Sequence, residues 1–557
     1  MYKDEKFWIA TDQGEPLYLL PGLANRHGII TGASGTGKTI TMKVMAESFS
    51  AAGVPVFMAD VKGDVAGICK MGEDSEGMQK RIKLHGLEPF QYKGFPTCFW
   101  DIYGKSGHHL RTTVSDMGPI LLSKLMNLSD VQTEVLNVVF KIADEAGLLL
   151  IDIKDLKAML KFVADHSDEF EREYGKLSPQ SISAIQRNVV SLESQGADIF
   201  FGEPMLDLND LFRCDSDGRG YINVLHSVEL ALNQTLYSAF MLWLLAEIYE
   251  NLPEVGDPEK PRAVFFFDEA HMIFDNAPKV LLDKVEQVVR LVRSKGVGIY
   301  FVSQSPSDIP EKVLAQLSNK VQHSLRAYTP KEQKAVRAAA EGFRVNPAFN
   351  TEKAILELST GEAVVSFLDE SGAPSIARRA WILPPQSFMG PISMSERAVF
   401  MAMSGMHEKY GETVDNESAF EILSERAEKA AYEAEEAKRA AEEAKLAEQQ
   451  AKEEAKAQAA AEKQAAKEAL AAEKAAQKEA EKAEKEAAKA AAAKQKAVNR
   501  VAGNVAAATG RSVAKSAAKS ITGKSTGLAG SIASTLGGSV GREVGQSIIR
   551  GLFGTRG

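Results

Sequence analysis

Residues 32–39 constrain the fold of this chain more than any other segment, because they satisfy the pattern GxxxxGK[ST] in full. Glycines in such a loop allow the backbone to wrap around a phosphate group with successive N–H groups pointing inward. The apolar run at 28–31 and the helical spacing of apolar residues at 40–49 predict a strand before the loop and a helix after it. The residues of this predicted nucleotide-binding loop are Gly32, Ala33, Ser34, Gly35, Thr36, Gly37, Lys38 and Thr39.

Two residues of the loop have specific expected roles. Lys38 is expected to neutralise the β and γ phosphates of a nucleotide, in binding and in catalysis. Thr39 is expected to hold Mg²⁺ through its hydroxyl. The loop therefore predicts ATP and Mg²⁺ as ligands.

An acidic pair follows a second apolar run. This run comprises residues 263–267, and Asp268 and Glu269 follow it directly. ATP hydrolysis needs a carboxylate near the metal ion and a group that orients the attacking water, and both are expected at the tip of a strand beside the phosphate loop. We expect Asp268 to bind Mg²⁺ through a water molecule and Glu269 to polarise the attacking water. His271 is interpreted as structural.

Polar residues also end two other apolar runs. Residues 54–59 precede Asp60, and residues 298–302 precede Ser303 and Gln304. Continuous β-branched and aromatic runs of this kind are typical of parallel strands buried on both faces. The pattern predicts an α/β fold whose mainly parallel sheet carries polar residues along one edge. Gln304 is a candidate sensor of the γ-phosphate, with an ordinary loop residue as the alternative.

Three arginines are candidates for stabilising transition-state charge at the nucleotide of a neighbouring subunit. Arg326 lies in the segment after Gln304 and is the favoured candidate. Arg290 and Arg293 lie on the helix predicted after the acidic pair. At each position a solvated arginine is the alternative.

The segment ADVKGD supplies three further charged residues, Asp60, Lys62 and Asp64. They follow the strand predicted at 54–59. They either border the nucleotide pocket or a central pore, or they form a polar turn around Gly63.

Composition divides the chain into regions. Residues 1–395 have the mixture of aliphatic, aromatic, Gly and Pro residues found in globular domains, and we assign them to the ATPase domain. Helical patterns between about 119 and 211 predict a helical insertion within it. The polar, Met-rich stretch at 396–417 is expected to be a linker.

The last two regions differ from the rest in composition. Residues 418–498 are rich in Ala, Glu and Lys, with many Glu/Lys pairs three and four residues apart, and predict a long helix. Because its seam positions are mostly Ala, an isolated solvated helix and a weak coiled coil are both open. Residues 499–557 are basic and rich in Gly, Ala and Ser, and predict a flexible tail. Candidate partners of the tail are a membrane surface, a nucleic acid or another protein.

Other features restrict the cellular setting. Cys69, Cys98 and Cys214 lie far apart, so neither a disulfide framework nor a zinc site is encoded. The first residues show no basic stretch followed by an apolar run, and no run of 18 apolar residues occurs, so we expect a cytoplasmic protein, with peripheral membrane association as a further candidate. The net charge of −9 argues against a globally basic coat for nucleic acid, but permits a local basic channel.

Four segments together resemble the HerA-like ATPases, in particular a bacterial family with a helicase HerA-like C-terminal domain. They are NRHGIITGASGTGKT (25–39), VFMADVKGDVAG (56–67), FFFDEAH (265–271) and VSQSP (302–306). The resemblance covers residues 1 to about 395. It implies a RecA-like P-loop core of the class shared with FtsK translocases and type IV secretion ATPases. That class typically forms hexameric rings, with the substrate in the central pore and a neighbour's arginine completing each site.

Three functions are open from the sequence. The leading hypothesis is an ATP-driven, ring-forming DNA translocase or helicase, in which hydrolysis is inferred from the residues and DNA from the resemblance alone. The first alternative is a protein-handling or envelope-associated ATPase of the secretion type, with the long helix as a reach and the basic tail as an anchor. The second is a scaffold whose assembly through the Ala-rich helix is switched by nucleotide.

Overall fold

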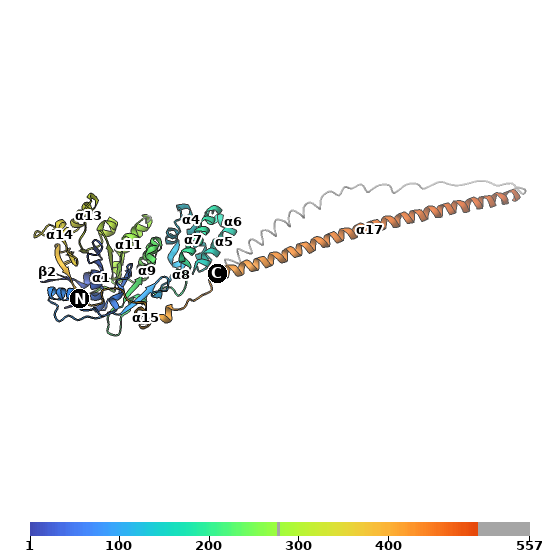
Figure 1. Ribbon diagram of the computed structural model, residues 1–557. Helices are drawn as coiled ribbons and strands as arrows, with labels where there is room; N and C mark the ends of the chain where they lie inside the picture. The colour runs from blue at the N-terminus through green and yellow to red at the C-terminus, as the bar shows by residue number, and fades with distance from the viewer. Residues whose placement is uncertain (276–278, 499–557) are drawn as a thin grey trace. The chain divides into compact units, whose positions relative to one another are not determined.

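The computed structural model describes residues 1–275 and 279–498, and within them 13 strands form one sheet (Figure 1). The strand order is β1-β2-β13-β12-β11-β4-β10-β9-β5-β8-β6-β7, with β3 paired to β2. Pairing is parallel from β11 to β7 and antiparallel among β1, β2, β3, β13, β12 and β11. The strands are β1 (Tyr2–Lys3), β2 (Lys6–Asp12), β3 (Glu15–Leu19), β4 (Gly28–Thr31), β5 (Val56–Asp60), β6 (Thr97–Asp101), β7 (His108–His109), β8 (Ile222–His226), β9 (Ala263–Phe267), β10 (Val297–Ser303), β11 (Asn319–Gln322), β12 (Glu362–Ser366) and β13 (Arg378–Ile382).

Helices connect these strands and cover the sheet (Figure 1). The α-helices are α1 (Lys38–Ala51), α2 (Glu76–His85), α3 (Val114–Leu125), α4 (Asp130–Glu145), α5 (Ile153–Asp165), α6 (Ser167–Tyr174), α7 (Pro179–Leu192), α8 (Asp198–Phe200), α9 (Gln234–Asn251), α10 (His271–Phe274), α11 (Lys279–Val292), α12 (Glu311–Leu314), α13 (Pro330–Glu341), α14 (Thr351–Glu357), α15 (Met394–Met403), α16 (His407–Tyr410) and α17 (Ala419–Val498). Short 3₁₀ or π turns are η1 (Pro21–Leu23), η2 (Ala66–Cys69), η3 (Glu193–Ala197), η4 (Leu208–Phe212), η5 (Leu230–Leu232), η6 (Arg293–Lys295) and η7 (Pro306–Asp308).

Strand β9 illustrates why the central strands read as unbroken apolar runs. All of its side chains are buried. Phe265 and Phe267 pack in the core cluster that includes α9 and α11, whereas Phe266 packs on the other face near Phe49 of α1. Successive side chains therefore enter two different cores, and both must be apolar. The predicted α/β class with a mainly parallel sheet is confirmed.

Strand order brings the predicted site segments to one edge of the sheet. β10 lies between β4, which leads into the phosphate loop, and β9, which ends at the acidic pair. β5 lies on the other side of β9. All four strands pair in parallel, so their carboxyl ends share one edge. The strands predicted at 28–31, 54–59, 263–267 and 298–302 are present as β4, β5, β9 and β10.

The predicted helical insertion is also present in the fold. Residues 114–212 contribute α3 to α8 with two short turns and no strand of the sheet. Leu136, Leu156 and Val189, from three of these helices, are fully buried in the same core cluster as α9. The insertion thus packs on the α9 side of the sheet rather than forming a separate core.

The stretch expected to be a linker contains α16 and most of α15. Tyr410 is buried, and its hydroxyl donates to Oδ2 of Asp210 at 2.5 Å. Arg397 is 4% exposed and donates to the carbonyl of Ser106 at 3.1 Å. The first compact unit runs from Met1 to Ser424, which includes this stretch. The boundaries drawn at 395 and 417 stay a prediction.

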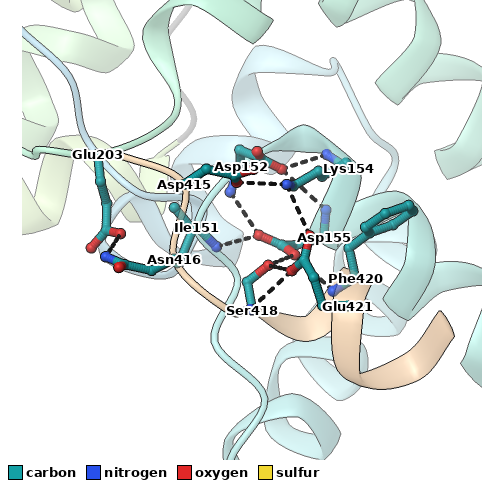
Figure 2. A network of polar contacts seen from close by, with 10 residues as sticks. All are labelled: Ile151, Asp152, Lys154, Asp155, Glu203, Asp415, Asn416, Ser418, Phe420 and Glu421. Atoms are coloured by element: carbon teal, nitrogen blue, oxygen red, sulfur yellow. Dashed lines mark hydrogen bonds and ion pairs between the residues drawn. The ribbon is translucent and has the colours of Figure 1, made fainter. Parts of the chain in front are cut away.

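The carboxylate of Asp155 joins the start of α5 to the start of α17 (Figure 2). Its Oδ2 accepts hydrogen bonds from the N–H groups of Ile151 at 2.8 Å and Asp152 at 3.0 Å. Its Oδ1 accepts from the Ser418 hydroxyl at 2.5 Å and the Phe420 N–H at 2.8 Å. The side chain is fully buried. One carboxylate therefore satisfies unpaired donors at two helix starts.

We expect Asp155→Ala to lower the free energy of unfolding by about 2–4 kcal/mol, because buried donors lose their charged acceptor. Urea titration followed by circular dichroism measures this loss. Asp415→Ala is the matched control, since it removes an exposed carboxylate that pairs with Lys154 at 2.7 Å in the same region (Figure 2). Its effect should be much smaller. Equal losses in the two variants would contradict the capping role of Asp155.

From Glu425 onward, α17 belongs to the second compact unit. Its side chains from 427 to 483 are exposed. Oppositely charged residues four positions apart form ion pairs on this surface, with Arg439–Glu435 at 2.7 Å and Lys452–Glu448 at 2.6 Å. The long helix predicted at 418–498 is present.

The flexible basic tail predicted at 499–557 lies outside the described residues. Among the helices of the described part, none combines the length and the apolar character that crossing a membrane requires.

Candidate active site

The phosphate loop connects β4 to α1, as the sequence predicts. Gly32, Gly35 and Gly37 have φ angles of 153°, 77° and 123°, which side-chain-bearing residues rarely adopt. The Nζ of Lys38 donates to the carbonyl of Gly32 at 2.7 Å and to that of Ala33 at 3.2 Å. The loop thus curves around the buried ammonium group. Thr39 follows in the first turn of α1 and is half-buried.

His323 supports the loop from the end of β11. Its Nδ1 lies 2.9 Å from the carbonyl of Glu362 and its Nε2 lies 2.8 Å from the hydroxyl of Thr41. Burial lowers the pKa of His323 to about 4, so the ring is neutral at pH 7 and has one donor and one acceptor nitrogen. A Cβ on Gly32 would lie 2.5 Å from the Cβ of His323. The loop glycine therefore permits close packing as well as the unusual φ.

Asp268 and Glu269 follow β9, separated from the phosphate-loop strand by β10 alone. Oδ1 of Asp268 accepts from the N–H of Glu269 at 2.8 Å, and the carbonyl of Asp268 accepts from the Tyr237 hydroxyl at 2.7 Å. Glu269 has a φ of 47°, a left-handed conformation that is uncommon outside glycine. Strained backbone of this kind is held in place by its surroundings and gathers at functional sites.

The two carboxyl groups of this pair have opposite pKa shifts. Burial, followed by the charge of Glu269, raises the pKa of Asp268 to about 7. Burial also acts to raise the pKa of Glu269, but the hydrogen bond and charge of Lys62 outweigh it, so that pKa lies below its ordinary value. Glu269 is therefore the carboxylate that ionises first, as a residue that accepts a hydrogen bond from water must.

Two nitrogen-bearing side chains contact Glu269. The Nζ of Lys62 lies 2.9 Å from its Oε1, and Nδ1 of His271 lies 3.3 Å from its Oε2. The sequence leaves Lys62 open between a pocket residue and a plain polar turn, and interprets His271 as structural. In the structure both lie beside the acidic pair.

Gln304 and Arg326 both lie near the predicted site. Gln304 directly follows β10 and is exposed, between the phosphate loop and the acidic pair in strand order. Arg326 is exposed and lies two residues after Ser324, whose carbonyl accepts from the N–H of Ala33 at 2.9 Å. Both positions are compatible with a contact to nucleotide, within one chain or from a neighbour.

Arg290 and Arg293 lie elsewhere. Arg290 is in the last turn of α11, and Arg293 is in η6 just before β10 begins. Arg293 pairs with Asp257 at 3.3 Å. Because β10 starts at the amino edge of the parallel sheet, neither arginine shares the edge that carries the phosphate loop and the acidic pair.

The donor set fits a magnesium nucleotide. The hydroxyl of Thr39 and the carboxylate of Asp268 supply the oxygen ligands that Mg²⁺ prefers, and Mg²⁺ is usually held by one or two carboxylates together with substrate phosphates. A nearby divalent cation would stabilise the ionised form of Asp268, whose burial disfavours charge. In the described part of the chain, no group of three or more His, Cys, Asp or Glu side chains is arranged to hold a metal without such a substrate.

A GxxxxGK[ST] loop and an acidic pair at neighbouring strand ends of a parallel α/β sheet define a P-loop ATPase. The model of the helicase HerA-like C-terminal family matches residues 5–482, and the chain belongs to this family. The family that the sequence motifs resemble is thereby confirmed, and the protein is an ATP-hydrolysing enzyme that uses nucleotide.

Two curated proteins are similar in sequence to parts of this chain. The probable helicase MJECL08 of Methanocaldococcus jannaschii is 30% identical over 139 residues, which cover 24% of this chain and 25% of that protein. The DNA double-strand break repair helicase HerA of Sulfurisphaera tokodaii is 22% identical over 382 residues, which cover 67% of each protein. The chain thus spans a quarter of the length of the first relative and about two thirds of the second.

Solved structures with some similarity to this chain include VirB4 and a bacterial conjugative coupling protein. VirB4 of Thermoanaerobacter pseudethanolicus has a TM-score of 0.46 and 13% identity, covering 69% of this chain and 97% of that chain. The bacterial conjugative coupling protein TrwB has a TM-score of 0.44 and 15% identity, covering 69% of this chain and 89% of that chain. The family assignment rests on the sequence match.

Proposed function

We propose that this protein is an ATP-driven motor that acts on DNA as a ring of identical subunits. The observation that carries the proposal is the convergence of Lys38, Asp268 and Glu269 at one edge of the sheet, around β10. Similarity to a DNA double-strand break repair helicase supports DNA as the substrate. The resemblance to HerA-like ATPases supports a hexameric ring.

The proposed reaction transfers the γ-phosphoryl group of ATP to water. Lys38 leaves the carbonyl of Gly32 and binds the β and γ phosphates, while the amides of the loop cradle them. Glu269 accepts a hydrogen bond from the attacking water and aligns that water with the γ-phosphorus. When bound through Thr39 and a water on Asp268, Mg²⁺ would neutralise phosphate charge. The products are ADP and inorganic phosphate.

Two residues are proposed to connect hydrolysis with movement. Gln304 follows β10 and would detect the loss of the γ-phosphate through its side-chain amide. Arg326 would stabilise transition-state charge at the nucleotide of a neighbouring subunit, and its exposure meets the requirement for such a contact.

Steady-state ATP hydrolysis with and without long duplex DNA, combined with light scattering, tests this function. We expect DNA to stimulate hydrolysis by a hexamer. The stimulation should weaken as salt rises, because contacts to DNA phosphates release counterions. Hydrolysis by a hexamer that does not respond to DNA at low salt would contradict the DNA motor and leave the ATPase assignment intact.

A further inference from the structure

Lys62 forms an ion pair with Glu269, the residue that we propose orients the attacking water. Its Nζ lies 2.9 Å from Oε1 of Glu269, and Nδ1 of His271 lies 3.3 Å from Oε2. Oε2 is buried and accepts no hydrogen bond from the described residues, so the contact from Lys62 to Oε1 is what holds the carboxylate in place. A carboxylate that orients water needs an oxygen that accepts from that water. The charge-assisted contact at Oε1 fixes where the Glu269 carboxylate points and thereby restrains its movement toward the attacking water.

The backbone fixes Lys62 in this position. β5 pairs in parallel with β9, so the residues that follow the two strands lie side by side. The N–H of Gly63 donates to Oδ1 of Asp60 at 2.8 Å, and Gly63 has a φ of 77°. This turn holds Lys62 next to Glu269 immediately after β5 ends. The contact is therefore built into the strand order and the turn.

The two partners of the ion pair differ in exposure. The side chain of Lys62 is 43% exposed, whereas that of Glu269 is 8% exposed. The ammonium group can move to another anion while retaining contact with solvent, but the carboxylate stays enclosed. After burial, the charge of Lys62 is the main influence that lowers the pKa of Lys38, so the two ammonium groups act on a shared space. An anion bound by Lys38 would attract Lys62 as well.

We propose that Lys62 is a positioning residue that restrains Glu269, and that a phosphate oxyanion releases Glu269 by drawing the Lys62 ammonium away. The proposal rests on the function proposed above for Glu269. The phosphate belongs either to the γ position of the nucleotide or to the backbone of a polynucleotide. In both cases Lys62 controls when Glu269 becomes available to water.

Lys62→Met tests this restraint, because it removes the charge and retains an unbranched side chain. We expect the kcat of ATP hydrolysis without DNA to rise by about 2- to 5-fold, the scale of a half-exposed ion pair, with little change in KM. Lys62→Arg retains a cation and should return the rate to that of the wild type. The double variant Lys62→Met/Glu269→Gln should be as slow as Glu269→Gln, because Lys62 acts through Glu269.

Lys105→Met is the matched control. Lys105 follows β6 at the same edge of the sheet and forms an ion pair with Glu229 at 2.8 Å, with 62% of its side chain exposed. Its replacement should leave the rate unchanged. Thermal unfolding of each variant reports whether the fold is intact.

The outcomes separate the restraint from the function on which it rests. A rate for Lys62→Met at or below that of the wild type would overturn the restraint. A raised rate that no longer responds to long duplex DNA would support the polynucleotide as the source of the phosphate. A raised rate with the wild-type response would support the nucleotide. Wild-type hydrolysis by Glu269→Gln would instead overturn the assignment of Glu269, and the restraint with it.

Discussion

Replacement of Glu269 by glutamine should lower the kcat of ATP hydrolysis by about 100- to 10,000-fold, the range expected for loss of a group that handles the proton of the nucleophile. Glutamine has the same shape, but its amide has one acceptor oxygen and no negative charge. The phosphate loop is unchanged, so ATP binding should persist. Phosphate release at saturating ATP measures the first quantity, and binding of a fluorescent ATP analogue measures the second.

Glu311→Gln provides the control for this change. Glu311 begins α12 and is exposed, so the same loss of charge occurs outside the acidic pair. We expect its kcat to match that of the wild type. If Glu269→Gln also hydrolysed ATP at the wild-type rate, another group would have to orient the water, and the role assigned to Glu269 would be wrong.

Lys38→Ala should raise the Kd for ATP by about 10- to 150-fold, because hydrogen bonds to charged groups contribute about 1.5–3 kcal/mol. Lys38 is only 5% exposed, and its Nζ donates to the carbonyls of Gly32 and Ala33, so its charge is enclosed by the loop. Hydrolysis should fall at all ATP concentrations, since the same charge acts in the transition state.

Lys80→Ala is the charge-matched control for Lys38→Ala. Lys80 lies on α2, and its side chain is 74% exposed. Isothermal titration with a slowly hydrolysed ATP analogue should give the wild-type Kd for this variant. An unchanged Kd for Lys38→Ala would contradict the placement of the phosphates in the 32–39 loop.

The strands that carry the chemistry were predictable because each is buried on both faces. Every residue of 28–31 and 263–267 is buried, and all but Thr31 are apolar or glycine, so each run differs clearly from the more polar sequence around it. The 418–498 helix was predictable for a different reason, since its composition favours helix without help from packing. In each case the signal is local in the sequence.

Contacts between distant segments carry no such local signal. His323 lies 282 residues from its partner Thr41 in the chain. The sequence around His323 does not indicate that its side chain packs against the phosphate loop. The pairing of Lys62 with Glu269 depends on β5 lying next to β9, which strand composition does not specify. The polar residues after β5 indicated the correct edge, but strand order alone identifies Glu269 as the partner.

The stretch at 396–417 shows a similar limit. Its polar, Met-rich composition favours a linker, yet buried anchors such as Arg397 and Tyr410 hold it on the first unit. A single buried residue within a polar stretch is hard to recognise from one sequence alone. Their partners, Ser106 and Asp210, lie about 200 to 290 residues away in the chain.

Displacement of streptavidin from the biotinylated end of a long linear duplex tests most directly the claim that hydrolysis at this site drives movement along DNA. The account predicts that the wild-type protein speeds streptavidin release in the presence of ATP, and that Glu269→Gln binds ATP without doing so. A wild-type protein that hydrolyses ATP on this DNA yet leaves streptavidin bound, at every duplex length, would contradict it.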